Sequence, residues 1–193
     1  MKKLILSLTI AYSIAGVAEE LITEDKLQTY RNAAQAFMQA LKAELQTAMK
    51  SDGPVKAIAV CKDKAPEIAE QKSTEYGFEL SRTSLKPRNP KNAPDSWETE
   101  VMKSFQQQKA DGADPMKLEH AEVVTTPEGK QVIRYMKAIP TAELCLTCHG
   151  SDIAPEIQAK LKELYPQDQA VGFEVGDLRG AFSFTEAVTQ KSE

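Results

Sequence analysis

The sequence contains few of the residues that bind metals or cross-link a fold. Its 193 residues include three cysteines, two histidines and one tryptophan, and aromatic residues make up 6% of the chain. Three cysteines cannot all pair within one chain, and a disulfide-rich scaffold would need many more. The composition therefore excludes a small disulfide-stapled domain and leaves little material for a zinc site with four ligands.

The sequence also lacks internal repeats, low-complexity tracts and any long hydrophobic segment beyond its first residues. Two lysines precede an apolar run over residues 4–17, and small residues at 16–18 (GVA) stand before two glutamates. This order is typical of a secretory signal peptide; an uncleaved anchor is the alternative, although the run is short for a membrane span. We predict a signal peptide over residues 1–18, export to the periplasm, and a single domain over residues 19–193.

The chain has no excess of positive charge. Its formal net charge is -4, and removal of residues 1–18, which contain two lysines and no acidic residue, moves it to -6. Nucleic acids and anionic membranes select basic surfaces. The charge therefore argues against both as partners.

The most informative feature is the CxxCH motif CLTCH at residues 145–149. Two thiols three residues apart can reach two vinyl groups on one edge of a porphyrin and form thioethers, and the adjacent histidine then lies under the iron. We predict haem c attached at Cys145 and Cys148, with His149 as one axial ligand. The predicted signal peptide agrees with this, because haem is attached to CxxCH outside the bacterial cytoplasm.

Two other sites use similar residues, a zinc knuckle and a thioredoxin-like redox pair. A zinc site would need a second pair of ligands, and only Cys61 and His120 remain. A thioredoxin-like pair would need a βαβ unit around it, and none is predicted before the motif.

The hydrophobic spacing predicts an α+β domain. A helical pattern over residues 20–49 and a second apolar stripe after Pro54 predict two long N-terminal helices. The first helix could also support a homodimer, and Pro66 would kink the second or begin a new segment. The remaining patterns predict strands over 78–84, 118–125, 131–139 and 180–188 and helices over 97–109 and 155–165. Together they give an antiparallel sheet with helical insertions.

The second axial ligand decides whether a haem iron binds small molecules or only carries electrons. His120 would give two histidine ligands, but Glu119 and Glu122 beside it are typical of a surface strand. Cys61 is the one cysteine outside the motif, on the apolar face of the second helix. It is either a distal thiolate or a buried, inert thiol. The methionines fill cores more often than they bind iron; they include Met102, Met116 and Met136.

Several segments together resemble one family. They are residues 57–61 (AIAVC), 82–90 (RTSLKPRNP), 92–98 (NAPDSWE), 145–150 (CLTCHG) and the stretch 165–180. The chain from about residue 27 to residue 188 is similar to the single-haem c-type domain with a PAS-like fold and His/Cys axial ligation. The resemblance implies a PAS-like antiparallel sheet and implies that Cys61 is the thiolate ligand. Redox sensing, gas sensing and electron transfer are the functions proposed for such domains.

The stretch at residues 82–90 also carries positive charge. Haem propionates need cationic partners when they are partly buried, and Arg82, Lys86 and Arg88 are candidates, Arg88 first among them. The alternative is an ordinary solvated basic loop. Trp97 and Tyr135 are candidates for pocket walls, although both also suit a core.

Three functions remain open. An iron held by His149 and Cys61 has no free position, which favours redox sensing or low-potential electron transfer with an unknown redox or signalling partner. Loss of Cys61 from the iron would allow a sensor of a small diatomic ligand such as CO or NO. An enzyme such as a peroxidase is disfavoured because it needs an open iron and a proton shuttle, and His120 is the one spare imidazole. We therefore predict a protein that is not an enzyme.

Overall fold

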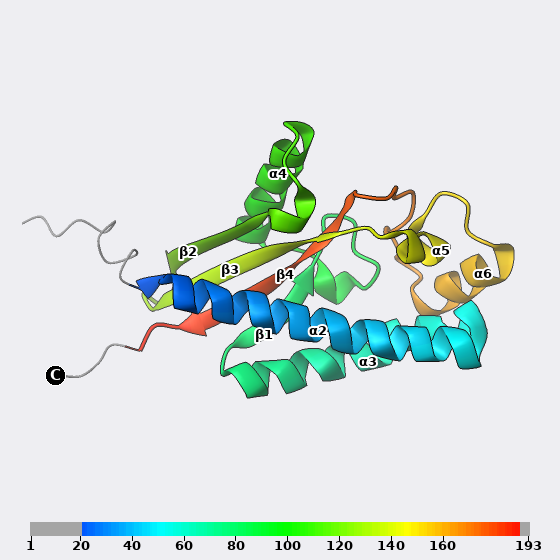
Figure 1. The fold of residues 1–193 in the computed structure, drawn as a ribbon, viewed down its shortest axis with the longest axis horizontal. Helices are drawn as coiled ribbons and strands as arrows, with labels where there is room; N and C mark the ends of the chain where they lie inside the picture. The colour runs from blue at the N-terminus through cyan, green and yellow to red at the C-terminus, as the bar shows by residue number, and fades with distance from the viewer. Residues whose placement is uncertain (1–20, 190–193) are drawn as a thin grey trace, which may run out of the picture.

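Two long helices, a four-stranded antiparallel sheet and a set of shorter helices form the domain in the computed structural model (Figure 1). The structure describes residues 21–189, so the predicted signal peptide at residues 1–18 lies outside the described residues. In chain order the elements are α2 (Glu24–Ser51), α3 (Gly53–Tyr76), β1 (Glu79–Thr83), η1 (Pro90–Asn92), α4 (Ser96–Ala110), η2 (Pro115–Lys117), β2 (Glu119–Thr125), β3 (Gln131–Pro140), η3 (Glu143–Cys145), α5 (Leu146–His149), α6 (Pro155–Leu164) and β4 (Leu178–Ala187).

Local signals in the sequence explain where the long helices begin and end. The side chain of Thr23 caps α2 by accepting a hydrogen bond from the backbone of Lys26. Gly53, at a φ of 79°, allows the chain to turn sharply, and Pro54 occupies the first turn of α3. The two helices then run side by side along the sheet (Figure 1).

The structure differs from the sequence at Pro66, which neither ends α3 nor begins a new segment. The helix continues through it to Tyr76. Proline inside a helix removes one backbone hydrogen bond and costs about 3 kcal/mol. Burial of the neighbouring Ala65 and Ile68 against the sheet offsets this cost, since both contribute to the main core.

The sheet has the strand order β1-β4-β3-β2, and every neighbouring pair is antiparallel. Side chains alternate between its two faces. One face packs against α2 and α3 through Tyr30, Phe37, Ala65, Ile68, Phe78, Leu80, Ile133, Tyr135, Phe182 and Phe184. The other packs against α4 through Val101, Met102, Phe105, Leu118, Met136, Ala138 and Ala181. The predicted α+β class, antiparallel sheet and long N-terminal helices are therefore confirmed.

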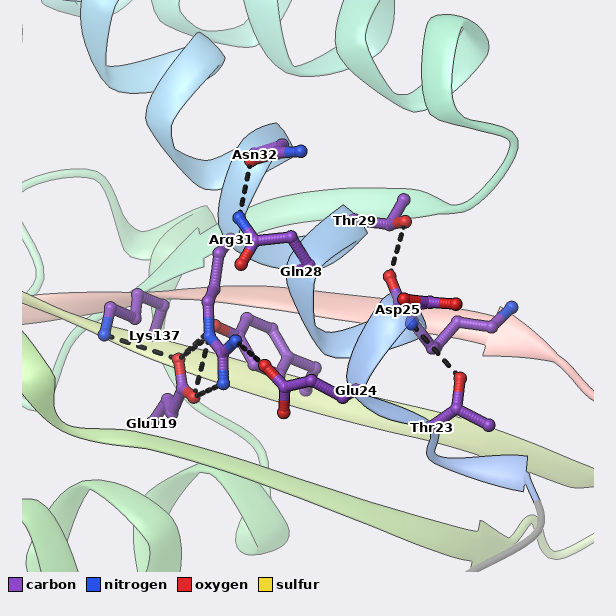
Figure 2. Close-up of polar contacts among 11 residues, drawn as sticks. Thr23, Glu24, Asp25, Gln28, Thr29, Arg31, Asn32, Glu119 and Lys137 are labelled. Carbon is purple, nitrogen blue, oxygen red and sulfur yellow. Dashed lines mark hydrogen bonds and ion pairs between the residues drawn. The ribbon is translucent and has the colours of Figure 1, made fainter.

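A polar cluster fastens the first half of α2 to the sheet. Arg31 lies between Glu24 of its own helix and Glu119 of β2 (Figure 2). Glu119 also accepts hydrogen bonds from the hydroxyl of Tyr135 over 2.8 Å and from Lys137 over 3.4 Å. This cluster holds the first half of α2 against the β2–β3 hairpin.

No helix among residues 21–189 is both long enough and apolar enough to cross a membrane.

Candidate functional site

The CxxCH motif lies just after β3, at the end of the molecule where α2 turns into α3 (Figure 1). Cys145 ends the short helix η3, and Cys148 and His149 lie on the single turn α5. The backbone of Thr141 exchanges hydrogen bonds with Asp177 and Gly176, at 2.7 and 2.8 Å, so the turn just before β4 holds the entry to the motif. The motif is therefore anchored between two central strands.

Helix α3 brings Cys61 to this motif. Cys148 packs against a small apolar cluster that contains Ile58 of α3, and Cys61 follows Ile58 by three residues, on the same helical face. Burial raises the pKa of the Cys61 thiol, while the positive charges of Arg82, Arg88 and Arg179 act in the opposite direction. The fold thus gathers all three cysteines of the sequence at one site.

The imidazole of His149 is held in one orientation. Its Nδ1 donates to the carbonyl of Ala170 over 2.8 Å, because a carbonyl can only accept. Its Nε2 faces Arg179, whose Nε donates to it over 3.4 Å. Burial, with the charges of Arg179 and Arg88, lowers the pKa of His149 to about 2. The ring is therefore neutral at physiological pH and keeps a lone pair on Nε2.

Three guanidinium groups surround these residues, and they have different partners. Arg88 is buried and pairs with Asp168 at 3.0 Å. Arg82 lies over the ring of Phe37 at 5.3 Å, and within residues 21–189 it has no hydrogen bond to a carboxylate. Arg179 has only neutral hydrogen-bond partners in the described part of the chain.

Burial lowers the pKa of both Arg82 and Arg179. For Arg179 the positive charges of Arg88 and Arg82 add to the effect of burial, and the pKa falls to about 10. Two cations that are held close together without carboxylate partners disfavour their own charged forms. An anionic group with two carboxylates would stabilise the charged forms of both guanidinium groups.

Lys86 lies at the edge of the site and is exposed. Its Nζ donates to the carbonyl of Val171 over 2.6 Å and sits 4.8 Å from the centre of the Phe173 ring. The ring of Phe173 in turn meets His149 edge-on, with centroids 6.2 Å apart. The segment after α6 therefore wraps over the motif.

The model of one protein family matches residues 20–186, and its description is Tll0287-like. The chain belongs to the Tll0287-like family. A solved structure, described as the crystal structure of the cyanobacterial heme-protein Tll0287, matches with a TM-score of 0.65 and 23% sequence identity. The match covers 89% of this chain and 100% of the solved chain, and at this identity it shows a shared fold. No curated protein matches the chain.

The residues of this Tll0287-like site fit a haem c. Thiols at Cys145 and Cys148 have the spacing that thioether attachment needs, and His149 offers a neutral Nε2. Arg82 and Arg179 are two half-buried cations that would suit the two propionates of such a group. Within residues 21–189 no three His, Cys, Asp or Glu side chains are close enough to hold a metal ion directly.

The other predicted ligands lie in different surroundings. His120 is 44% exposed on β2 and contacts Glu122 and Trp97. Met102 and Met136 are buried in the core beneath α4, whereas Met116 is 64% exposed. Trp97 packs against this core and bonds to Glu122, and Tyr135 belongs to the main core.

A large open hollow of about 660 Å³ lies beside the motif, and its wall includes Gly150, Tyr165 and Asp168. Neither Cys61 nor His149 is part of its wall. The hollow therefore borders the site at Asp168 but is not lined by the two candidate axial ligands.

Two residues of the site, Arg179 and Asp168, were not predicted from the sequence. Arg179 lies in the stretch 165–180 that carries the family resemblance, so the signal was present but had no chemistry attached to it. Asp168 lies in the same stretch, two residues after Pro166, and its sequence context assigns it no role. Only the fold shows that it pairs with Arg88.

Proposed function

We propose that this Tll0287-like chain carries one haem c, attached at Cys145 and Cys148, with His149 and Cys61 as axial ligands. We also propose that it works in redox sensing or low-potential electron transfer. The carrying observation is that Cys61 on α3 lies close enough to Cys145 and Cys148 to affect their electrostatics, beside a motif histidine that is neutral and held in one orientation. The description of the solved Tll0287 protein as a heme-protein supports the proposal.

The chain's own residues would prepare the site for this cofactor. Haem supplies an iron that gains and loses one electron at a time. The carbonyl of Ala170 orients the His149 ring, and Arg82 and Arg179 are placed to neutralise propionates. If Cys61 of α3 and His149 of α5 both bound the iron, no coordination position would stay open for a substrate. We therefore propose a redox partner protein, and no catalytic reaction.

We further propose that the protein is exported, because the sequence of residues 1–18 has the form of a signal peptide. The PAS-like description of the sheet is likewise a proposal from the family resemblance. Export would place the chain where c-type haem is attached and would make its partner another periplasmic or membrane-bound redox or signalling protein.

Covalent attachment is tested by maturing the chain with c-type haem and denaturing it. We expect the mass of the denatured chain to include one haem. We expect this haem to be lost when both Cys145→Ser and Cys148→Ser are made. Thr147→Ala, between the two thiols, is the matched control and should keep it. A denatured wild-type chain without haem would contradict the proposal.

The same protein tests the alternative, a sensor of CO or NO. The reduced protein is exposed to CO and its absorption spectrum is followed. A spectrum that does not change supports an electron carrier or redox sensor with both axial ligands in place. A change would mean that a ligand leaves the iron, and it would favour gas sensing through loss of Cys61.

A further inference from the structure

The carbonyl oxygen of Ala170 accepts hydrogen bonds from two side chains at once. It accepts from Nδ1 of His149 over 2.8 Å and from Nη2 of Arg88 over 3.0 Å. Ala170 itself is fully buried. Because a hydrogen bond is directional, the position of this one oxygen sets the plane of the imidazole ring and selects the tautomer with a proton on Nδ1.

Asp168 holds both the arginine and the backbone at this point. Its Oδ2 accepts from Nε of Arg88 over 3.0 Å, and its Oδ1 accepts from the backbone N–H of Ala170 over 2.8 Å. The side chains of Arg88 and Asp168 are 9% and 11% exposed, so their bonds form in a medium of low dielectric constant. Arg88 also donates to the carbonyl of Cys148. The pair therefore connects the motif, Ala170 and the loop after β1.

Other contacts hold the same segment without these two side chains. They are backbone hydrogen bonds from Phe173 to His149 (2.9 Å), from Gly172 to Gly150 (3.0 Å) and from Gln169 to Pro87 (3.0 Å). The segment should therefore stay in place when Arg88 or Asp168 is changed. What would be lost is the fixed position of the Ala170 carbonyl.

We propose that Arg88 and Asp168 form a positioning unit for His149, acting through the carbonyl of Ala170. The part that concerns iron rests on the function proposed above. A histidine whose Nδ1–H is held by an acceptor donates more strongly to a metal through Nε2. Without the unit the Nδ1–H bond is longer and less well directed. The imidazole then donates less, the ferric state is less stabilised, and the reduction potential rises. Arg88 would then act on the orientation of His149, and the propionate contacts would fall to Arg82 and Arg179.

Two substitutions and a control test the unit in the full mature chain. Asp168→Asn keeps the size of the side chain and removes its charge. Arg88→Lys keeps the charge and loses the planar fork that reaches three acceptors. Lys91→Gln removes one positive charge from the same loop at an exposed position and is the control. The readouts are the exchange rate of the Nδ1 proton by NMR in the reduced state and the midpoint potential.

We expect the Nδ1 proton to exchange roughly five- to tenfold faster in Asp168→Asn and Arg88→Lys, the change that follows from weakening one hydrogen bond. The potential should rise in both and stay unchanged in Lys91→Gln. Equal exchange rates and potentials in all four proteins would overturn the positioning unit. If Asp168→Asn does not fold by circular dichroism, Arg88→Lys decides.

The failure of this inference can be told apart from failure of the proposed function. The mass of the denatured chain is read first, and a chain without covalent haem counts against the proposed function. The exchange of the His149 ring proton does not require iron, so it still decides whether Arg88 and Asp168 position the ring.

Discussion

Three arginines near one site have three different environments, and the neighbours of each decide what it can do. Arg88 is fully engaged by Asp168 and two carbonyls. Arg82 and Arg179 are half-buried without carboxylate partners in the described part of the chain, and desolvation lowers the pKa of each. A buried cation without an anion costs stability, so these two are the ones that gain from a bound carboxylate.

At this scale we predict that the effect of Arg82→Gln depends on haem. In the haem-loaded protein it should lower the free energy of unfolding by about 1.5–3 kcal/mol, the value of a hydrogen bond to a charged group. In the Cys145→Ser, Cys148→Ser background it should be neutral or stabilising, because it removes an unpaired buried charge. Urea denaturation measures both. The same loss in both backgrounds would mean that Arg82 does not contact a propionate.

Substitution of the distal residue gives a second prediction. Cys61→Ala should alter the low-spin ferric EPR signal and raise the reduction potential, because a thiolate is a strong donor that stabilises ferric iron. His120→Ala is the matched control: the side chain is 44% exposed, and its substitution should leave the low-spin ferric EPR signal unchanged. An unaltered spectrum in Cys61→Ala would exclude the thiolate, and high-spin iron in His120→Ala would move the assignment to His120.

At the scale of secondary structure, α2 combines an apolar face that covers the sheet with a polar attachment near its start. Glu119 of β2 accepts hydrogen bonds from Arg31 of α2 (Figure 2). It also accepts one from the hydroxyl of Tyr135. Burial acts to raise the pKa of Glu119, but the hydrogen bonds from Arg31 and Tyr135 and the charge of Lys137 outweigh it, so the pKa is lowered. The ionised carboxylate of Glu119 is therefore more stable in the folded protein than in the unfolded chain.

This gives a prediction with a defined pH range. A lowered pKa contributes stability that is fully present above the unfolded value, about 4.3 for glutamate, and is lost as the pH falls below it. We expect Glu119→Gln to be less stable than wild type by about 1–3 kcal/mol at pH 7, and this difference to shrink below about pH 4. Urea denaturation at several pH values measures it. The exposed Glu100→Gln on α4 is the control, and a difference that does not depend on pH would contradict the assignment.

Most elements follow from local signals, which is why their type could be predicted from the sequence. The Asp95 capping box that begins α4 and the glycine turn between β2 and β3 specify their own neighbourhoods. The continuation of α3 through Pro66 could not be predicted in the same way. It depends on burial of the residues beside Pro66 against a sheet that is distant in sequence.

At the scale of the whole molecule, the site is assembled from α3, β1, the loop after β1, η3, α5, the segment between α6 and β4, and β4. Its stability is therefore coupled to that of the domain. We predict that the chain with Cys145→Ser and Cys148→Ser, which cannot attach haem, unfolds at a lower urea concentration than the haem-loaded protein. A group that binds only the folded state stabilises that state, and the half-buried Arg82 and Arg179 would lose their counterions without it. Equal midpoints would mean that the haem is not packed inside the domain.

The sequence by itself determined the CxxCH motif, the order of helices and strands and the α+β class, because spacing, capping and turn residues act over a few positions. Only the tertiary structure decided which distant residues meet that motif. The sequence does not say whether Cys61 lies near the motif, and the packing of Ile58 of α3 with Cys148 of α5 brings it there. The pairing of Arg88 with Asp168, and the absence of such a partner for Arg82 among residues 21–189, followed from the same packing. Charge and ligation in a buried site depend on neighbours that are far apart in sequence, and local patterns carry no information about them.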